Sequence, residues 1–255
     1  MKAELDTIEK TYDVSILFAC EAGSRAWGFP SKNSDYDVRF IYVHHPHWYL
    51  SIDEKRDVIE LPINDLLDMN GWDVKKALKL LRKSNPSLLE WLHSEIVYYE
   101  NEAFTQQLRI LSEKFFSPLP SLYHYLHMAN ANYEKFLRAD QVKIKKYFYT
   151  LRPLLACKWI EKYETFPPMS FEGLMAETLC EGRLTEEIQM LLSKKMGGDT
   201  LHLVPRNTAI NEFIEKEIKH LKKRSKTMKS SKLDPTDKLN QLFRTTLFDS
   251  WGWKL

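Results

Sequence analysis

The stretch from Gly23 to Phe40 decides the fold, and it reads Gly-Ser-Arg-Ala-Trp-Gly-Phe-Pro-Ser-Lys-Asn-Ser-Asp-Tyr-Asp-Val-Arg-Phe. A strand that begins at Asp35 sends Asp35, Asp37 and Arg39 to one face of a sheet, because side chains alternate along a strand. The opposite face receives the apolar and aromatic residues Tyr36, Val38, Phe40 and Tyr42. Two carboxylates about 7 Å apart on one face repel each other. A cation between them therefore explains their placement best.

The segments before this stretch predict a short helix and a buried strand. Residues 2–11 form an amphipathic helix with Leu5 and Ile8 on one side, and the apolar run from Val14 to Cys20 suits a buried strand. Glycine, proline and asparagine then make residues 24–34 a turn-rich connection.

The segments after it predict weaker strands and then helices. Short strands are expected at residues 57–61 and 65–69, between turn residues. A helix should begin at Asn70, because Asn70 and Asp73 resemble a capping box before an apolar period of three and four. A short helix is expected at residues 87–93, and residues 96–99 lead out of this half.

Beyond about residue 102 strand signals almost vanish. Helices are expected at residues 102–115, 119–139, 142–164, 170–180, 184–195, 206–223 and 235–248, separated by Pro and Gly. The pattern predicts an α+β fold: a small mixed β-sheet with flanking helices, followed by an α-helical C-terminal half. We assign residues 1–100 to the first domain and residues 101–255 to the second.

The composition indicates a folded protein and excludes several classes. The 255 residues are 44% hydrophobic and 28% charged, with a net charge of +2, so nucleic-acid binding would need a local basic patch. Three widely spaced cysteines fit neither a disulfide framework nor a Cys-x-x-Cys metal site. The first residues do not resemble a targeting signal, and no apolar run is long enough for a membrane span. We expect a cytoplasmic protein without a membrane partner.

The motifs resemble those of a known superfamily. Gly23-Ser24, eleven residues before Asp35-x-Asp37, is similar to the Gly-Ser and Asp-x-Asp signature of the DNA polymerase β-like nucleotidyltransferases. The following segments resemble the predicted nucleotidyltransferase branch of bacteria and phages, which is associated with RNA ligases: Glu-x-Gly-Ser-Arg-Ala-Trp-Gly-Phe, Ser-Asp-Tyr-Asp-Val-Arg-Phe, Asn-Gly-Trp-Asp-Val-Lys-Lys-Ala-Leu and Lys-Lys-Tyr-Phe-Tyr-x-Leu-Arg-Pro-Leu-Leu-Ala. The resemblance spans roughly residues 13–165.

The resemblance implies a nucleotide site with bound metal. Gly23 and Ser24 would hold the terminal phosphates of a nucleoside triphosphate, with Arg25 beside them. Asp35 and Asp37 would bind Mg²⁺, with Mn²⁺ as an alternative, in two-metal phosphoryl chemistry. Arg39 would touch a phosphate, balance the two carboxylates or form a structural ion pair.

A third carboxylate is expected from a neighbouring strand. Asp68 is our choice as a catalytic metal ligand, because it lies in the strand expected at residues 65–69. Asp65 would face the opposite way, and Asp73 has a competing explanation as a helix cap.

A second group of candidate nucleotide contacts lies on the helix expected at residues 142–164. Lys145, Tyr149 and Arg152 are spaced i, i+4 and i+7, so they share one helix face. This face would close the helical domain over the nucleotide, with cations on phosphates and the tyrosine on base or ribose. The alternative is a solvated cationic face beside a buried aromatic residue.

Other notable residues have plainer interpretations. His44, His45 and His47 do not have the spacing of a zinc site, and His124 with His127 is a pair on a helix surface. Trp27, Trp72 and Trp91 are expected in the core. The basic run from Lys216 to Lys232 is either an RNA-binding patch or a solvated helix end without interleaved aromatic residues.

The function predicted from these features is nucleotidyl transfer. A Mg²⁺-dependent enzyme would transfer a nucleoside monophosphate from an NTP, with ATP as first choice, to a hydroxyl or phosphate acceptor and release pyrophosphate. An RNA end is one acceptor class, and a small molecule or protein side chain is the other. The alternative is a regulatory module that binds nucleotide or RNA without turnover. The base preference, the acceptor and the oligomeric state do not follow from the sequence.

Overall fold

The structure is a computed structural model that describes residues 1–63, 66–198, 203–228 and 233–253. The chain forms two compact units, and each is built from more than one chain segment. The first unit comprises Met1–Gly23, Asp35–Phe115 and Lys232–Leu255, and the second comprises Ser24–Ser34 and Phe116–Ser231. These units are interleaved, whereas the predicted domains 1–100 and 101–255 are continuous; that assignment stays a prediction.

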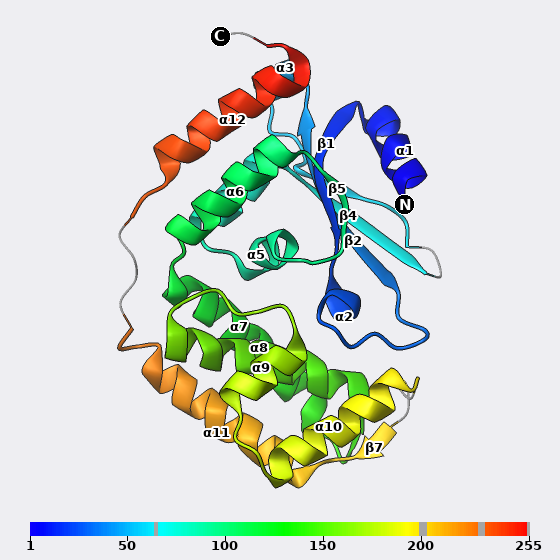
Figure 1. The fold of residues 1–255 in the computed structure, drawn as a ribbon, viewed down its shortest axis with the longest axis vertical. Coiled ribbons are helices and arrows are strands. Elements are labelled where there is room, and N and C mark those ends of the chain that lie inside the picture. The colour runs from blue at the N-terminus through cyan, green and yellow to red at the C-terminus, as the bar shows by residue number, and fades with distance from the viewer. Residues whose placement is uncertain (64–65, 199–202, 229–232, 254–255) are drawn as a thin grey trace. The chain divides into compact units, whose positions relative to one another are not determined.

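A five-stranded mixed sheet organises the first unit (Figure 1). Its strands are β1 (Val14–Glu21), β2 (Tyr36–His44), β3 (Val58–Glu60), β4 (Leu67–Asp73) and β5 (Val97–Glu100). Their spatial order is β3-β4-β2-β1-β5, and β2 and β4 run parallel while the other neighbours are antiparallel. The parallel pair is the feature that positions the candidate site.

Helices cover both faces of this sheet. They are α1 (Lys2–Tyr12), α3 (Pro46–Tyr49), α4 (Val74–Arg82), α5 (Pro86–Leu92), α6 (Glu102–Lys114) and α12 (Thr236–Trp251). On one face Leu5 and Ile8 of α1 pack with Val38 and Phe40 of β2. The other face packs against α4, α5, α6 and α12. Figure 1 shows α1 on the opposite side of the sheet from α6.

The alternation predicted for the second strand is confirmed. Val38, Phe40 and Tyr42 belong to the core cluster under α1. Ile41 and Val43 belong to the cluster under α4 and α5. Asp37 and Arg39 have the parity of Ile41, so they lie on the face covered by α4 and α5.

The predicted start of the helix at Asn70 is wrong. β4 continues to Asp73, and α4 begins at Val74 with Asp73 as its N-cap, whose side chain accepts a hydrogen bond from Lys75 N at 2.8 Å. Asn70 pairs with Arg39 in the parallel ladder instead. A pairing between distant segments therefore overrode a local capping pattern.

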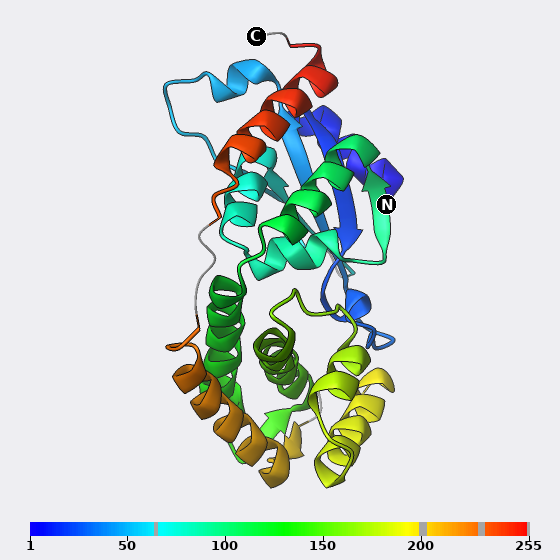
Figure 2. The same ribbon diagram turned by 60° about the vertical axis from the view of Figure 1, so that its left-hand side comes forward.

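The second unit is helical, as predicted for the C-terminal half. Its elements are α7 (Pro118–Asn132), the π-helix η1 (Tyr133–Leu137), β6 (Gln141–Lys143), α8 (Ile144–Tyr163), α9 (Phe171–Thr178), α10 (Arg183–Met196), β7 (Leu203–Pro205) and α11 (Thr208–Arg224). The helix α8 is buried along most of its length and lies among the other helices of this unit (Figure 2). The predicted helix spans agree with these within a few residues.

Two features of the second unit were not predicted. β6 and β7 pair antiparallel as a two-stranded ribbon of three residues each. The segment Ser24–Ser34 also packs in this unit, because Phe29 is buried among Phe148 and Phe171. This segment begins inside α2 (Gly23–Ala26), because Gly23 belongs to the first unit and Ser24 to the second.

The predicted α+β class is confirmed by this mixed sheet and the helical C-terminal half. Among the described residues, no helix combines the length and the apolar character needed to cross a bilayer.

The buried charge of Asp73 gives a test of the packing. Asp73 is buried, and its carboxylate accepts hydrogen bonds from Tyr49 Oη at 2.7 Å and from Lys75 N. Burial raises the pKa of Asp73 to about 6, so the folded state binds the proton more readily than the unfolded state between pH 4 and 6. The contribution of this group to stability therefore falls as the pH rises through that window.

We predict that Asp73→Asn stabilises the protein at pH 7.5 and not at pH 4. Asparagine keeps one of the two acceptor oxygens, which can still cap Lys75 N, and removes a buried charge, for a gain of up to roughly 3 kcal/mol at the higher pH, at about 1.4 kcal/mol per pKa unit. Urea unfolding at both pH values measures the difference. Burial also lowers the pKa of His44 to about 4, so the contribution of His44 to stability changes with pH in the opposite direction to that of Asp73. This contribution is the same in the native protein and in Asp73→Asn, and it cancels when the two are compared.

The matched control is Asp53→Asn, which removes an exposed carboxylate of the preceding loop and should leave the free energy of unfolding unchanged. A loss of stability in Asp73→Asn at pH 7.5 would show that the charge itself stabilises the fold.

Candidate functional site

Two carboxylates face each other on neighbouring strands of the first unit. The parallel register of β2 and β4 places Asp37 opposite Asp68. Neighbouring strands lie about 4.8 Å apart, and residues at the same register position point to the same face. The structure therefore brings the chosen third carboxylate next to the second aspartate of the Asp-x-Asp motif, and its catalytic role stays a prediction.

Arg39 connects these two carboxylates. Its Nη2 atom donates to Asp37 Oδ1 at 3.1 Å and to Asp68 Oδ2 at 2.8 Å. Its Nη1 atom donates to the main-chain oxygens of Val38 at 3.0 Å and of Asp68 at 2.9 Å. The guanidinium thus balances the negative charge at the point where both carboxylates converge.

The backbone of Asp37 is fixed by a residue that the sequence reasoning missed. Glu21 is fully buried at the end of β1, and its Oε1 accepts a hydrogen bond from Asp37 N at 2.9 Å. Its Oε2 accepts one from the hydroxyl of Tyr98 on β5. Ala22 N also donates to Asp37 O at 2.8 Å. The sequence signal for this role is the position of Glu21, a charged residue at the end of an otherwise largely apolar strand.

Burial and neighbouring acids favour the protonated form of Asp37. Burial is the largest cause that raises its pKa; Arg39 lowers it in part, and Asp68, Glu21 and Asp35 raise it further. An added cation would stabilise a site of this kind. Its charge would offset the repulsion between the carboxylates and the cost of burying them.

Gly23 lies against the carboxylate of Asp37. Its φ is +60°, and a Cβ at this position would overlap Asp37 Oδ2. Only glycine combines this left-handed conformation with so close an approach. Glycine at position 23 therefore lets the turn after β1 pass beside the Asp37 carboxylate.

The remaining residues of the first motif divide between the two units. Asp35 is exposed and precedes β2 in the first unit. In the second unit Ser24 Oγ bonds to Ser34 Oγ at 3.2 Å, and Arg25 Nη2 donates to Ser34 O at 2.8 Å. Ser34 thus closes the loop from residue 24 to residue 34, and the phosphate-binding roles of Ser24 and Arg25 stay predictions.

The candidate contacts on α8 pack against an aromatic residue of the second unit. Arg152 is 1% exposed, and its Cζ lies 4.5 Å from the ring centroid of Trp27. Tyr149 meets the same ring edge-on at 6.2 Å. Lys145 is half-buried one turn before Tyr149. Arg152 is therefore part of the core of this unit and not of a solvated cationic face.

The tryptophans expected in the core do pack with apolar clusters. Trp27 contacts the cluster of the second unit. Trp72 and Trp91 stack on each other in the first unit with centroids 3.8 Å apart.

The donors available for a metal are carboxylate oxygens. In the described part of the chain, no group of three or more His, Cys, Asp and Glu side chains converges as a metal cluster. Asp37 and Asp68 do converge on one cation, the guanidinium of Arg39. Oxygen donors of this kind suit a hard cation such as Mg²⁺, so the pair fits the predicted metal with Asp35 adjacent in sequence.

The other candidate ligands have other contacts. Asp73 caps α4, as the alternative interpretation of this residue predicted, and it also accepts a hydrogen bond from Tyr49. Asp65 lies outside the described residues. His44 stacks on Trp48 with centroids 4.1 Å apart, and His45 stacks on His47 at 5.0 Å.

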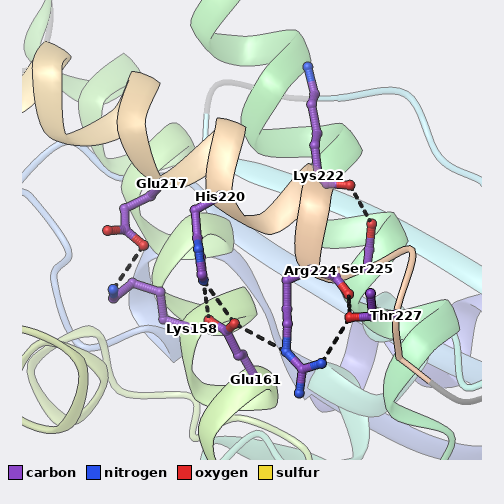
Figure 3. Close-up of polar contacts among 8 residues, drawn as sticks. All are labelled: Lys158, Glu161, Glu217, His220, Lys222, Arg224, Ser225 and Thr227. Carbon is purple, nitrogen blue, oxygen red and sulfur yellow. Dashed lines mark hydrogen bonds and ion pairs between the residues drawn. The ribbon is translucent and has the colours of Figure 1, made fainter.

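The basic run from Lys216 to Lys232 is described as far as Lys226, and Lys229 and Lys232 lie outside the described residues. Figure 3 shows that part of this charge is paired with α8. Glu161 on α8 accepts from His220 at 2.8 Å and contacts Arg224 at 3.5 Å. The described lysines of the run are exposed, and its RNA binding stays a prediction.

Comparisons with known proteins agree with the predicted resemblance. The family model described as RlaP, RNA repair pathway DNA polymerase beta family, matches residues 1–245. An uncharacterized protein of Bacillus subtilis (strain 168), YcgL, is 52% identical over 248 residues, which cover 97% of this chain and 95% of that protein. A crystal structure of a nucleotidyltransferase-like protein from Exiguobacterium sibiricum 255-15 aligns with 89% of this chain and 75% of its own, at 12% identity and a TM-score of 0.33.

We predict that Gly23→Ala weakens metal binding by at least tenfold. The added Cβ displaces the Asp37 carboxylate, and the positive φ adds a strain of about 1–2 kcal/mol. Titration with Mn²⁺, followed by electron paramagnetic resonance, measures the affinity.

Gly28→Ala is the matched control. Gly28 has a φ of +85°, and a Cβ there would meet nothing within 4 Å. Its variant should lose a similar amount of stability and keep the Mn²⁺ affinity. Equal Mn²⁺ affinities in both variants would contradict the role of the close approach.

Proposed function

The chain belongs to the RNA repair pathway DNA polymerase beta family, and from this membership we propose that it is a Mg²⁺-dependent nucleotidyltransferase acting on RNA ends. By family it is a DNA polymerase β-like nucleotidyltransferase. The proposed reaction transfers a nucleoside monophosphate from an NTP, with ATP as first choice. The RNA acceptor is supported by the repair pathway in the family description.

The observation that carries the proposal is the convergence of Asp37 and Asp68 on one guanidinium, with Gly23 against the same carboxylate. Asp37 and Asp68 would hold Mg²⁺ together with Asp35. When bound, Mg²⁺ would neutralise the triphosphate and lower the pKa of the attacking hydroxyl. Glu21, itself held by Tyr98, accepts from the backbone amide of Asp37, so this proposed metal ligand would be in place before substrate arrives.

In the proposed reaction an acceptor oxygen attacks the α-phosphorus of the NTP. The bond from that phosphorus to the bridging oxygen breaks, pyrophosphate leaves, and the proton of the acceptor hydroxyl passes to solvent or to a neighbouring carboxylate. The protein chiefly supplies position and charge in this type of chemistry. Asp37 and Asp68 would then share their charge with bound Mg²⁺, and Arg39 would be released to another partner.

One observation favours the alternative of a binding module without turnover. Arg39 already neutralises the carboxylate pair, and the described residues hold no cluster of three metal ligands. A nucleotidyltransferase fold with a permanent ion pair in this position would bind nucleotide or RNA without chemistry. The two functions differ in whether Mg²⁺ displaces Arg39.

Incubation with radiolabelled NTPs and RNA tests the proposal. With Mg²⁺ and RNA carrying a 3′-hydroxyl or a terminal phosphate, label from the α-phosphate should enter RNA and label from the γ-phosphate should enter pyrophosphate. Asp37→Asn and Asp68→Asn should each lower the rate at least a hundredfold, because each removes a metal ligand. Asp53→Asn, an exposed acid of the same unit, should keep the rate.

Entry of the γ-label into RNA would indicate phosphoryl transfer and contradict nucleotidyl transfer. Absence of transfer with every NTP and RNA end, with unchanged NTP affinity in Asp37→Asn, would favour the binding module.

A further inference from the structure

The solvent side of α4 carries a row of cations in the first unit. Lys75, Lys79 and Arg82 follow one another at i, i+4 and i+7, so they share a face and extend over about 10 Å of the helix. All three are exposed. Their opposite face is buried through Val74, Ala77, Leu78 and Leu81, which fixes the row toward solvent.

A pocket of about 210 Å³ lies beside this row, between α4 and α12. Its apolar lining comes from Leu78, Leu239 and Phe243, and Thr236 and Asn240 add polar groups. The ring of Phe243 is half-buried and meets Tyr49 edge-on at 5.0 Å. The pocket thus offers an aromatic wall next to positive charge.

Within the described chain, the charge of this row is not compensated by ion pairs on the side that faces the pocket. Among the described residues, no carboxylate lies within ion-pair distance of the three cations, and none lines this pocket. Arg82 Nη1 donates to Thr236 Oγ1 at 3.3 Å. Asp234 is near enough that Arg82 contributes to lowering its pKa, after the hydrogen bonds from Thr236. On the side of this pocket, Asp234 is therefore the carboxylate near the row, whereas Lys75 and Lys79 also line a cavity with acids on the other side.

Two other pockets differ from this one in the charge of their lining. A cavity of about 270 Å³ on the other side of Lys75 is lined by Asp53, Glu54, Asp57 and Asp73 as well as by lysines. Lys76 is paired with Asp57 there at 2.9 Å. In the second unit, the pocket beside Lys219 and Lys222 is lined by Glu134 and Glu215. Both are less suited to an anion than the pocket between α4 and α12.

We propose that the row Lys75, Lys79 and Arg82 with its adjoining pocket binds single-stranded RNA. The cations would contact successive backbone phosphates, since they spread along the helix and do not converge on one point. A base would enter the pocket against Phe243, because aromatic faces accept any base without sequence preference. The inference rests on the proposed function and names where its RNA acceptor is held.

The position of α4 in the chain supports this assignment. β4 carries Asp68 and runs directly into α4, so both belong to one compact unit. Asp73 follows Asp68 by five positions along the strand, which is about 17 Å. An RNA strand whose end lies at Asp68 can therefore reach α4 with a few nucleotides, at about 3.4 Å for each stacked nucleotide.

Fluorescence anisotropy with a 5′-labelled RNA 12-mer, without NTP and with EDTA present, tests the proposal. The variant Lys75→Ala/Lys79→Ala/Arg82→Ala should bind at least tenfold more weakly in low salt. The dependence of log K on log salt should become shallower by about 2, because each lost phosphate contact contributes about 0.7 for a single strand. Phe243→Leu should weaken binding with an unchanged salt slope.

Two controls separate charge at this surface from folding and from charge elsewhere. Lys75→Arg/Lys79→Arg/Arg82→Lys keeps the charges and should keep the affinity. Lys216→Ala/Lys219→Ala/Lys223→Ala removes three exposed cations of α11 and should change the affinity less than threefold.

Equal losses in the two alanine triples, a loss confined to the α11 triple, or no RNA binding by the native protein would overturn the proposal. A failure of the proposed enzyme function is a separate result, since label transfer can be absent while this binding and its dependence on α4 remain.

Discussion

Repulsion between Asp37 and Asp68 is the constraint on which the rest of the first unit depends. Two unit charges about 5 Å apart cost about 3 kcal/mol at an effective dielectric constant near 20. The fold nevertheless places them at facing positions of a parallel strand pair, where the guanidinium of Arg39 forms an ion pair with each of them. Buried Glu21 adds a further negative charge and holds the amide of Asp37. Such an arrangement is costly for stability alone, and a cation that binds there relieves the cost.

The same constraint explains the path of the chain after β1. Gly23 must pass so close to Asp37 that no side chain fits, and the next eleven residues then leave the first unit and pack with the helices of the second. Phe29 anchors that segment in the second core, where its carbonyl accepts from Lys195, whose pKa burial lowers to about 8. A motif that is continuous in sequence is thus divided between two compact units.

Much of the fold and part of the site followed from the sequence. The resemblance is confirmed by the family match, and the alternation after Asp35 correctly assigned the faces of β2. The errors have a common physical origin. Asn70 and Asp73 have the local appearance of a cap, but pairing with β2 extends β4 through Asn70. Glu21 finds its hydroxyl partner 77 residues later in Tyr98, and no local pattern reports such a contact. β6 and β7 are too short to show a period.

Counting charges along the sequence identifies basic runs, but the neighbours of each charge decide what a run can bind. The lysine-rich run that begins in α11 is the longest basic run in the sequence, yet Glu161 of α8 pairs with His220 and Arg224 within it (Figure 3). The row on α4 contains three cations within eight residues. Two nearby acids have partners outside the row, because Asp73 accepts from Tyr49 and Asp57 pairs with Lys76, while Asp53 and Glu54 share a cavity with Lys75 and Lys79. With a net charge of only +2, the local field of this chain is therefore set by which acids the fold withdraws into other contacts.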